Sequence, residues 1–417
     1  MPLCAACQET KGFNKFHADQ KRARQPVCKQ CFRTGRTPVV IETDAEEIRK
    51  KPMTLDSFQL LSVIGQGAFG RVLLVRHKTT AQVHAMKIIS KKFLVERESV
   101  LYMKAERDIM TKIRHPFVIH LEYAFQTDAK VYIVMEYQSG GELFSYLRRE
   151  GTFSEVKARF YLAEMILALE HLHAKGIIHR DLKPENVLIS AQGHVKLTDF
   201  GLAKEYREGD ELLTVCGTKE YMAPEMLLGK GYDSAVDWWS LGALAHEMLT
   251  GHPPFRAKNA KDLQQQILTA KLQLPKWLSP EAHSLLKSLL ERNVSKRLGG
   301  GKSTMFVVRG VQALKNHPFF KKIDWPAMEK LQVPPPLIPR VMGDTDTSNI
   351  DVKFTRMTPG DLLCDAVEAE IDDQFRGFSF YGFDSLVTAS MATMSLHRRP
   401  STEVKSPINS LVTTLVR

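Results

Sequence analysis

Two short stretches in the middle of the chain hold the residues best suited to chemistry. The first, HRDLKPEN at 179–186, places a carboxylate, an amine and an amide close together. Asp181 could accept the proton of a hydroxyl group, and Lys183 could neutralise a phosphate during its transfer. Asn186 and the Asp199 of the later DFG sequence offer hard oxygen ligands to Mg²⁺. A single Asp in such a stretch is more often a helix cap or turn residue, so each assignment needs the others.

A glycine-rich segment and a lysine upstream could hold the phosphates themselves. The sequence GQGAFGRV at 65–72 would let a hairpin lie close to phosphate oxygens and donate backbone N–H groups. Alone it would fit a tight turn equally well, and the strand that follows it disfavours a dinucleotide site. Lys87 emerges from the apolar run VHAMKII and needs a carboxylate, for which Glu106 is the natural partner. A lone Lys–Glu pair would more often be a solvated surface bridge.

Apolar periodicity predicts the elements that must position these residues. From 58 to 137 the apolar runs are short, alternating and β-branched, which predicts strands, with one helical stretch at 99–113. Beyond about residue 140 the pattern is mostly helical. Two of these helical stretches, 158–176 and 237–251, end in glycine, the usual helix stop.

Taken in order, the motifs resemble those of protein kinases. The glycine segment, Lys87, Glu106, HRDLKPEN and DFG are followed by Ala223-Pro224-Glu225. The complete set favours an active enzyme over a pseudokinase. By the same resemblance, the Lys of DLKPEN is the signature of kinases that act on serine and threonine. TVCGT, SGGELF, VDWWSLGAL and FRGFSF resemble the AGC group; GHVKLTDFGL, AFQTDAKVYIVMEY and FTRMTPGD resemble its ribosomal S-six kinase branch. This resemblance covers about 58–382.

The resemblance implies an α+β, bilobal protein kinase fold with a small β-rich N-lobe, a helical C-lobe and an AGC C-terminal tail. The cysteines near the start predict a zinc-ribbon-like module before this fold, which is not a usual part of this kinase branch. The expected parts are a Cys4 module (1–40), a linker (41–57), the catalytic domain (58–320), an AGC C-terminal domain with a hydrophobic motif (321–382) and a flexible tail (383–417).

It also implies a set of site residues for ATP and magnesium. Met135 would be the gatekeeper, and the backbone of Glu136 and Tyr137 would read adenine. Catalysis would use Asp181, Lys183, Lys87 and Glu106, with Asn186 and Asp199 on magnesium. The expected nucleotide contacts are Ile64, Gly65, Gln66, Gly67, Ala68, Phe69, Gly70, Arg71, Val72, Ala85, Lys87, Met135, Glu136, Tyr137, Glu142 and Leu188.

Protein substrates with basic residues upstream of Ser or Thr would meet three acids. Glu142, Glu185 and Glu247 match positions that contact such residues in related kinases, although an ordinary surface acid is the alternative for Glu247. The partners expected are these substrates and an upstream activating kinase. Arg398 and Arg399 precede Ser401 and Thr402, which resembles the preferred substrate sequence and suggests autophosphorylation there.

Two phosphorylation sites would regulate the enzyme. Phosphate on Thr214 would be held by Arg180 and Lys204. Phosphate on Ser379 would tighten an aromatic plug on the small lobe beside the Glu106 helix, although an anchor without a switching role is the alternative. A buried pair of Glu225 and Arg297 is also implied. Leu362 stands where the family has a turn-motif serine, which leaves only Thr358-Pro359 and puts that control in doubt.

Four cysteines near the start form a separate candidate site. Cys4, Cys7, Cys28 and Cys31 make two C-x-x-C pairs whose spacing suits tetrahedral structural zinc, with free thiols or a redox role as the alternative. His17 lies between the pairs and is expected at the surface. The partner of this module, whether RNA, protein or membrane, is left open.

Composition limits the remaining possibilities. The 417 residues carry a net charge of +11, which suits phosphate-bearing ligands, acidic membranes or nucleic acid without choosing among them. No apolar run spans a membrane and the start lacks a signal-peptide core, so we expect an intracellular, cytoplasmic protein, with the nucleus as a further open compartment. The alternatives to an active kinase are a kinase-shaped scaffold without turnover and a zinc-dependent adaptor.

Overall fold

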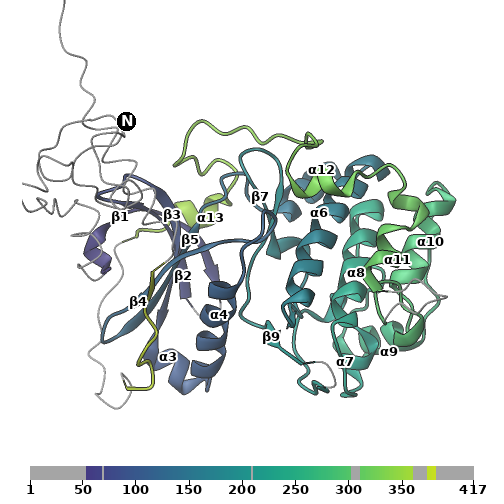
Figure 1. The fold of residues 1–417 in the computed structure, drawn as a ribbon, viewed down its shortest axis with the longest axis horizontal. Helices are drawn as coiled ribbons and strands as arrows, with labels where there is room; N and C mark the ends of the chain where they lie inside the picture. The colour runs from purple at the N-terminus through teal and green to yellow at the C-terminus, as the bar shows by residue number, and fades with distance from the viewer. Residues whose placement is uncertain (1–52, 68–69, 208–209, 302–309, 360–372, 382–417) are drawn as a thin grey trace, which may run out of the picture. The chain divides into compact units, whose positions relative to one another are not determined.

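The structure is a computed structural model that describes residues 53–67, 70–207, 210–301, 310–359 and 373–381. Within this part, a strand-rich small lobe is followed along the chain by a helical large lobe (Figure 1). The α+β bilobal arrangement expected from the sequence is therefore confirmed. The Cys4 module and the tail after Tyr381 lie outside the described residues.

An antiparallel six-stranded sheet forms the small lobe. Its strand order is β1-β2-β3-β5-β4-β10, so the last strand comes from near the end of the chain. Alternating apolar residues bury one face of β1 to β3, where Val63, Leu73 and Met86 are fully buried. The strands are β1 (Phe58–Gly67), β2 (Gly70–His77), β3 (Val83–Ser90), β4 (Leu121–Gln126), β5 (Lys130–Glu136) and β10 (Phe380–Tyr381).

Two helices interrupt these strands, so the prediction of a single one was wrong. α4 (Val100–Lys112) is the predicted helix, and it buries Met103, Glu106 and Ile109. α3 (Lys91–Glu96) follows β3 without a break. Its cap is Ser90, whose hydroxyl accepts a hydrogen bond from the N–H of Phe93 at 3.4 Å. Six residues are too few to display a helical period, which explains why the sequence did not reveal α3.

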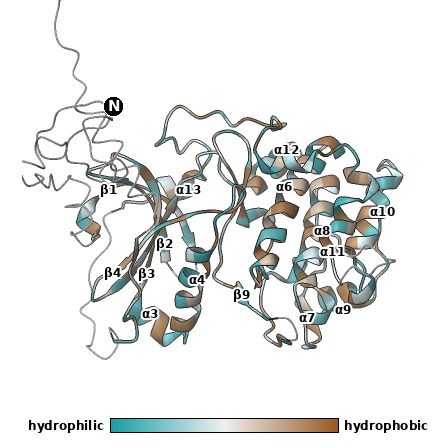
Figure 2. Cartoon of the chain, viewed as in Figure 1, coloured by the Kyte–Doolittle hydropathy of each residue, from teal (hydrophilic) through white to brown (hydrophobic). Residues whose placement is uncertain are grey.

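The large lobe is built around two long buried helices. α6 (Glu155–Ala174) and α8 (Ala235–Thr250) pack together, and α8 is buried from Ala235 to Leu249. Gly176 and Gly251 follow them with φ of 68° and 82°, which confirms the glycine stops. The hydrophobic colouring concentrates on these inner helices (Figure 2).

Shorter elements complete the fold. The other helices are α5 (Leu143–Glu150), α7 (Pro224–Leu227), α9 (Ala260–Thr269), α10 (Pro280–Leu289), α11 (Gly310–Lys315), α12 (Trp325–Glu329) and α13 (Val352–Thr355). Short 3-10 helices are η3 (Leu55–Ser57), η4 (Pro184–Asn186), η5 (Lys219–Tyr221), η6 (Val294–Lys296) and η7 (Pro318–Phe320). Two small sheets pair β6 (Ile177–Ile178) with β9 (Lys204–Glu205), and β7 (Val187–Ile189) with β8 (Val195–Leu197). None of the described helices has both the length and the apolarity needed to cross a membrane.

The lobes are joined in two places that matter for the site. Residues 117–119 bond to β8, where the N–H of Ile119 donates to the carbonyl of Leu197 at 2.9 Å. The tail after α12 runs without helix or strand past the connection between the lobes. There the Tyr137 hydroxyl donates to the carbonyl of Asp346 at 2.6 Å, and the Asn349 amide donates to that of Ser139 at 3.0 Å.

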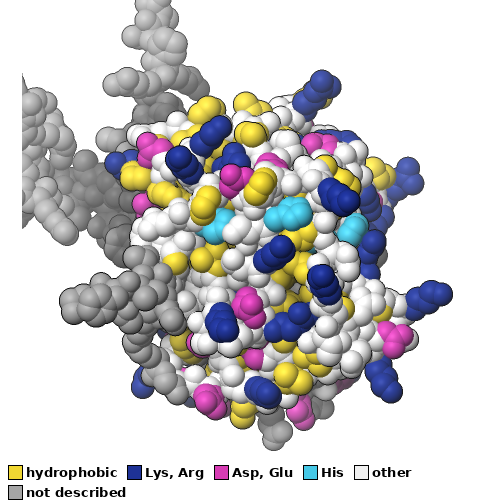
Figure 3. All heavy atoms as spheres, turned by 90° about the vertical axis from the view of Figure 1, so that its right-hand side faces the viewer, with side chains coloured by type: hydrophobic (Ala, Val, Ile, Leu, Met, Phe, Trp, Pro, Cys, Tyr) yellow, Lys and Arg dark blue, Asp and Glu magenta, His cyan; other side chains and the backbone are white. Residues whose placement is uncertain are grey.

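Charge is distributed unevenly along this fold. Residues 251–330 contain 15 Lys and Arg but only five Asp and Glu, an excess of ten that nearly equals the +11 of the whole chain. The described residues of this range include α9, α10 and α11, at the end of the large lobe away from the small lobe, and α12, which packs on α6 (Figure 1). Figure 3 views that end and shows basic side chains spread over it, with hydrophobic ones between them.

Candidate active site

The loop between β6 and η4 holds Asp181 in place. Arg180 has φ of 69°, an unfavourable backbone conformation that surrounding bonds must maintain. The fully buried carboxylate of Asp237, on α8, accepts the N–H groups of His179 and Arg180, each at 2.9 Å. Burial opposes ionisation of Asp237, but the hydrogen bond and charge of His173 outweigh it, and its pKa lies below the ordinary value. The charged carboxylate of Asp237 therefore fixes the backbone of the loop that carries Asp181.

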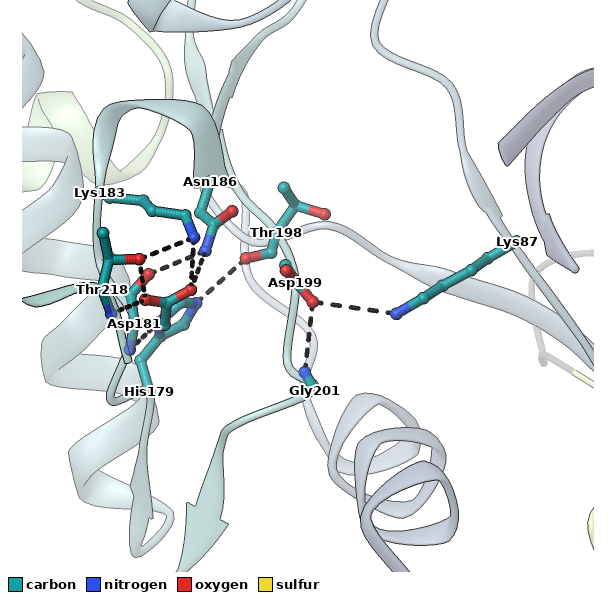
Figure 4. A network of polar contacts seen from close by, with 9 residues as sticks. All are labelled: Lys87, His179, Asp181, Lys183, Asn186, Thr198, Asp199, Gly201 and Thr218. Carbon is teal, nitrogen blue, oxygen red and sulfur yellow. Dashed lines mark hydrogen bonds and ion pairs between the residues drawn. The ribbon is translucent and has the colours of Figure 1, made fainter. Parts of the chain in front are cut away.

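Both carboxylate oxygens of Asp181 have partners. Oδ1 accepts the N–H of Thr218 at 2.9 Å and its hydroxyl at 2.8 Å. Oδ2 accepts the ammonium of Lys183 at 2.8 Å, and that ammonium also donates to the Thr218 hydroxyl at 3.0 Å (Figure 4). A substrate hydroxyl would join or displace these donors, so the arrangement suits a carboxylate held ready to accept one proton.

Asn186 and Asp199 belong to the same network. The Asn186 amide nitrogen donates to the carbonyl of Asp181 at 2.8 Å and to its Oδ2 at 3.1 Å, which directs the amide oxygen away from Asp181 (Figure 4). The N–H of Thr198 donates to the Asn186 carbonyl at 2.9 Å, and Asp199 follows with φ of 62°. A second unfavourable backbone angle therefore turns Asp199 out of β8 toward the site.

Lys87 lies between two carboxylates. Its ammonium is 2.7 Å from Glu106 Oε1 and 3.8 Å from Asp199 Oδ1. Burial disfavours the ammonium, but these charges outweigh it and the pKa of Lys87 is raised. Desolvation opposes ionisation of Asp199, although 48% of its side chain is exposed, and the charges of Lys87 and His179 hold its pKa below the ordinary value. The solvated surface bridge considered as an alternative is excluded, because only 3% of Glu106 is exposed.

The donor set fits magnesium arriving with phosphate. Mg²⁺ commonly binds one or two carboxylates, substrate phosphates and waters, without a cage of protein ligands. Among the described residues, no group of three or more His, Cys, Asp and Glu side chains forms a ready-made metal site. The Asp199 carboxylate and the Asn186 amide oxygen could supply the one or two ligands that such an ion needs.

One face of the small sheet carries the expected nucleotide side chains. Val72 lies opposite Lys87 across β2 and β3, and Ala85 is two residues before Lys87, so all three share a face. Arg71 lies opposite Ile88, which puts its side chain on the other face and leaves only its backbone for a ligand. Ile64 and Leu188 are partly buried, and Met135 lies beside Ala85.

The glycines of the turn between β1 and β2 differ in what they need. A Cβ on Gly70 would lie 2.0 Å from the carbonyl oxygen of Ile88, so packing alone requires glycine there. A Cβ on Gly67 would meet no atom within 4 Å, and no contact within the described chain requires that glycine. Gly65 and Gln66 pair with Val72 and Arg71. Ala68 and Phe69 lie outside the described residues.

The carboxylate of Glu136 has a role that the sequence did not suggest. Its Oε1 accepts the N–H of His120 and the ammonium of Lys196, each at 2.8 Å, and its Oε2 accepts the Gln138 amide at 2.9 Å. The N–H of Glu136 itself donates to the His120 carbonyl at 3.1 Å. The carboxylate therefore links the connection between the lobes to His120 and Lys196.

The three predicted substrate acids act on one another electrostatically. Burial and then the charge of Glu185 raise the pKa of Glu142; burial and the charges of Glu185 and Glu220 raise that of Glu247. Glu185 is exposed. Only 6% of Glu247 is exposed, and it accepts a hydrogen bond from the Tyr221 hydroxyl, so the ordinary surface acid considered for it is excluded. Glu220 is an additional acid of this group.

The expected regulatory positions have defined surroundings. Thr214 is exposed, and its carbonyl accepts the Tyr232 hydroxyl at 2.7 Å, to which Arg180 donates at 3.0 Å. Lys204 is exposed on β9. The predicted pair of Glu225 and Arg297 is confirmed by two hydrogen bonds of 2.5 and 2.8 Å, with Arg297 buried.

The aromatic tail motif lies on the small lobe beside α4, as expected. Phe375 and Phe378 are fully buried. The Arg107 guanidinium lies 5.4 Å from the Phe378 ring and donates to the carbonyl of Gly377 at 3.1 Å. Arg107 neighbours Glu106, so the motif contacts the helix that holds the partner of Lys87. Ser379 is exposed at this junction.

Some predictions fall outside the described residues. They concern the zinc ligands Cys4, Cys7, Cys28 and Cys31, the Leu362 substitution and the Ser401-Thr402 site.

Sequence reasoning missed three residues that the structure places in the network. Thr218 lay in the TVCGT motif and Asp237 in VDWW, so both were noticed as family signatures without a role. Lys196 lies three residues before Asp199. The only signal for it was its place between the apolar residues Val195 and Leu197, which indicates that its side chain lies on the opposite face of the strand from theirs.

Comparisons with known proteins agree with this geometry. Residues 58–320 match the family described as "Protein kinase domain", and residues 341–380 match "Protein kinase C terminal domain". A "RAC family serine/threonine-protein kinase homolog" of Dictyostelium discoideum is 46% identical over 78% of this chain and 71% of its own length. "Serine/threonine-protein kinase AtPK2/AtPK19" of Arabidopsis thaliana is 48% identical over 76% and 66%.

A further relative is "Ribosomal protein S6 kinase beta" of Caenorhabditis elegans, 49% identical over 78% of this chain and 59% of its own. The matched region thus covers about three-fifths to seven-tenths of these relatives. A protein kinase domain implies ATP and Mg²⁺ as the phosphate donor and its metal. The chain belongs to the protein kinase family, as a serine/threonine kinase of the AGC type near the ribosomal S6 kinases.

Proposed function

We propose that this kinase transfers the γ-phosphate of ATP to Ser or Thr in protein segments rich in Arg and Lys. The observation that carries the proposal is a polar network around Asp181, which Lys183, Asn186 and Thr218 contact directly (Figure 4). The His179 ring lies 3.1 Å from the carbonyl of Thr198, the residue before Asp199. Asp199 in turn lies 3.8 Å from the ammonium of Lys87. Groups for a hydroxyl, for phosphate and for magnesium are thus held in fixed relation.

Each residue has a step within this reaction. Asp181 orients the acceptor hydroxyl and takes its proton, while Lys183 offsets negative charge on the phosphate in transit. Lys87, held by Glu106, positions the donor phosphates. Asp199 and Asn186 are the residues that would hold magnesium, which would supply positive charge to offset that of the donor phosphates. The acids Glu142, Glu185 and Glu247 would attract guanidinium groups upstream of the acceptor.

A peptide array with radiolabelled ATP and Mg²⁺ tests this proposal. Transfer should dominate on peptides with arginine at the third and fifth positions before the acceptor, and Asp181→Asn should abolish it. A signal that is independent of upstream arginine would reject the substrate class. No transfer at all after activation-loop phosphorylation would favour the nucleotide-binding scaffold instead.

We also propose regulation by phosphate at Thr214 and Ser379. Arg180 supports the first site, because it donates to the Tyr232 hydroxyl, which donates in turn to the carbonyl of Thr214. The contact of the aromatic motif with Arg107 on α4 supports the second. An upstream kinase would supply the phosphate at Thr214. Phosphosite mapping of active protein should find both residues modified. Full activity in both Thr214→Ala and Ser379→Ala proteins would contradict the proposal.

A structural zinc ion on Cys4, Cys7, Cys28 and Cys31 remains a separate proposal, supported by their spacing alone. Metal analysis of reconstituted protein should find one equivalent. Less than half an equivalent would reject zinc and leave the thiol alternatives.

A further inference from the structure

Two acidic residues lie near each other where the tail crosses the large lobe. Glu142 directly precedes α5, and the carbonyl of its neighbour Gly141 accepts the N–H of Ile189 in β7 at 2.8 Å. Glu185 lies in η4, which ends where β7 begins. Burial, and then the charge of Glu185, raise the pKa of Glu142. Within the described part of the chain the Glu142 carboxylate forms no ion pair, so it can accept a guanidinium from a substrate.

The C-terminal tail brings a third acid to this place. A Cβ on Gly141 would lie 2.4 Å from the carbonyl oxygen of Asn349, so the tail backbone touches that of Gly141 and a side chain there would separate them. Asp351 follows two residues later and caps α13, where its Oδ1 accepts the N–H of Lys353 at 3.0 Å. The charge of Asp351 also acts on Glu142. We call Glu142, Glu185 and Asp351 the acidic subsite.

A cation of the tail already lies at the acidic subsite. The Lys353 ammonium is 3.3 Å from Asp351 Oδ2 and 4.6 Å from the centre of the Phe354 ring. Phe354 packs against the core of the small lobe, and α13 packs on β1 (Figure 1). The Lys353 side chain is therefore held at the acidic subsite, although 64% of it is exposed. Its charge opposes the rise in the pKa of Glu142 more strongly than the charge of Arg148 does.

We propose that Lys353 competes with the arginine upstream of the acceptor for the acidic subsite, and so weakens the preference of the kinase for that arginine. An ammonium is a point charge, whereas a guanidinium binds a carboxylate through two parallel N–H groups. A substrate arginine can therefore displace the ammonium, at a cost in affinity that an enzyme without Lys353 would not have. This inference rests on the proposed function, because it concerns the same upstream arginines.

A purely structural role is the alternative for Lys353. In that case its ammonium would only complete the cap of α13, and its loss would loosen the tail, which also contacts the connection between the lobes at Tyr137 and Ser139. The KM values for ATP and for every peptide would then rise together. Competition predicts the opposite sign, a fall in KM, and only for peptides that carry the arginine.

Steady-state kinetics with matched peptides tests the inference. One peptide carries arginine at the third and fifth positions before the acceptor, and two others each replace one arginine with alanine. Lys353→Gln should lower the KM of the first peptide about threefold, with kcat and the KM for ATP unchanged. One alanine peptide should show no such gain, which identifies the arginine concerned.

Two further variants and salt separate charge from shape. Lys353→Arg should leave the KM at least as high as the original one, and Lys353→Glu should lower it further, by about tenfold in all. Raising the ionic strength should shrink both gains, because exposed charges are screened.

Arg356→Gln is the matched control, because Arg356 is exposed at the C-terminal end of α13 and loses the same charge. Its KM values should equal those of the unmodified enzyme. A KM that is unchanged in Lys353→Gln, that changes equally for all three peptides, or that falls as much in Arg356→Gln would overturn the competition while the proposed function stands. Equal turnover of all three peptides by the unmodified enzyme, or no turnover of any, would instead count against the proposed function, and the inference would fall with it.

Discussion

At the scale of single residues, Thr218 is the group that ties Asp181 to Lys183. Its hydroxyl donates to the carboxylate and accepts from the ammonium, so it fixes their separation. Thr218→Val keeps the shape but leaves Lys183 with one acceptor fewer and Asp181 with one donor fewer. We expect kcat to fall at least about tenfold, with little change in the KM for ATP, whereas Thr218→Ser should retain most activity. Full activity of Thr218→Val would show that the hydroxyl is not required, and a loss in Thr218→Ser as large as in Thr218→Val would show that the hydroxyl alone is not sufficient.

Lys196 illustrates a residue that acts through another. Its ammonium is 2.8 Å from Glu136 at the connection between the lobes, and it precedes Asp199 by three residues on the same stretch. Its pair with Glu136 is partly exposed, which limits it to about 1 kcal/mol. We expect Lys196→Gln to raise the KM for ATP about fivefold with kcat nearly unchanged, and Lys196→Arg to restore it. A fall in kcat alone would mean that Lys196 positions Asp199 rather than the nucleotide.

At the scale of elements, α4 depends on a segment more than 260 residues away. Phe378 packs beside Arg107, and β10 then joins the edge of the sheet at β4. Phe378→Ala should cost about 3 kcal/mol of docking free energy, enough to release residues 373–381 without unfolding the lobe. Faster trypsin cleavage after Arg376 and lower kcat should appear together, because freed α4 positions Glu106 less well.

Tyr381→Phe serves as the control for that experiment. It keeps the ring on the sheet edge and removes only the hydroxyl that accepts the N–H of Met53 at 3.0 Å. Its cleavage rate and kcat should stay near those of the unmodified protein. If Phe378→Ala speeds cleavage but leaves kcat intact, the motif is an anchor without influence on Glu106.

The elements also show how far sequence could predict this molecule. Periodicity and glycine stops located α4, α6 and α8, because each is long enough to repeat its pattern. The motifs identified Lys87, Asp181 and Asp199 because their chemistry is explicit in the residue type. What could not be predicted depends on tertiary contact. The carboxylates of Asp237 and Glu136 accept hydrogen bonds from groups that are distant in sequence. The strand register, which the sequence does not show, puts the Arg71 side chain on the face of the sheet away from the expected nucleotide.

At the scale of the whole molecule, acid should act on stability through buried histidines of the small lobe. His84, on β3, is 4% exposed, and its Nε2 has no hydrogen-bond partner. The rings of Phe58 and Tyr123 meet it edge-on at 6.3 and 6.0 Å. Burial, then the charge of His77, lowers the pKa of His84 to about 4. The folded state therefore resists a proton that the unfolded chain accepts near its ordinary pKa of about 6.5.

The sign and window of the effect follow from that difference. Between pH 6.5 and 4 the unfolded chain binds more protons, so stability is complete above pH 6.5 and falls as pH drops toward 4. This one ring should cost about 2 kcal/mol by pH 5. Leucine cannot titrate, so between pH 7.5 and 5 the free energy of unfolding of His84→Leu should fall by about 2 kcal/mol less than that of the unmodified protein, as measured in urea titrations. Equal losses of unfolding free energy in the two proteins would show that His84 takes up its proton without unfolding. The acid sensitivity of the catalytic unit would then lie elsewhere. His115, whose pKa burial also lowers to about 4, would be the next residue to replace.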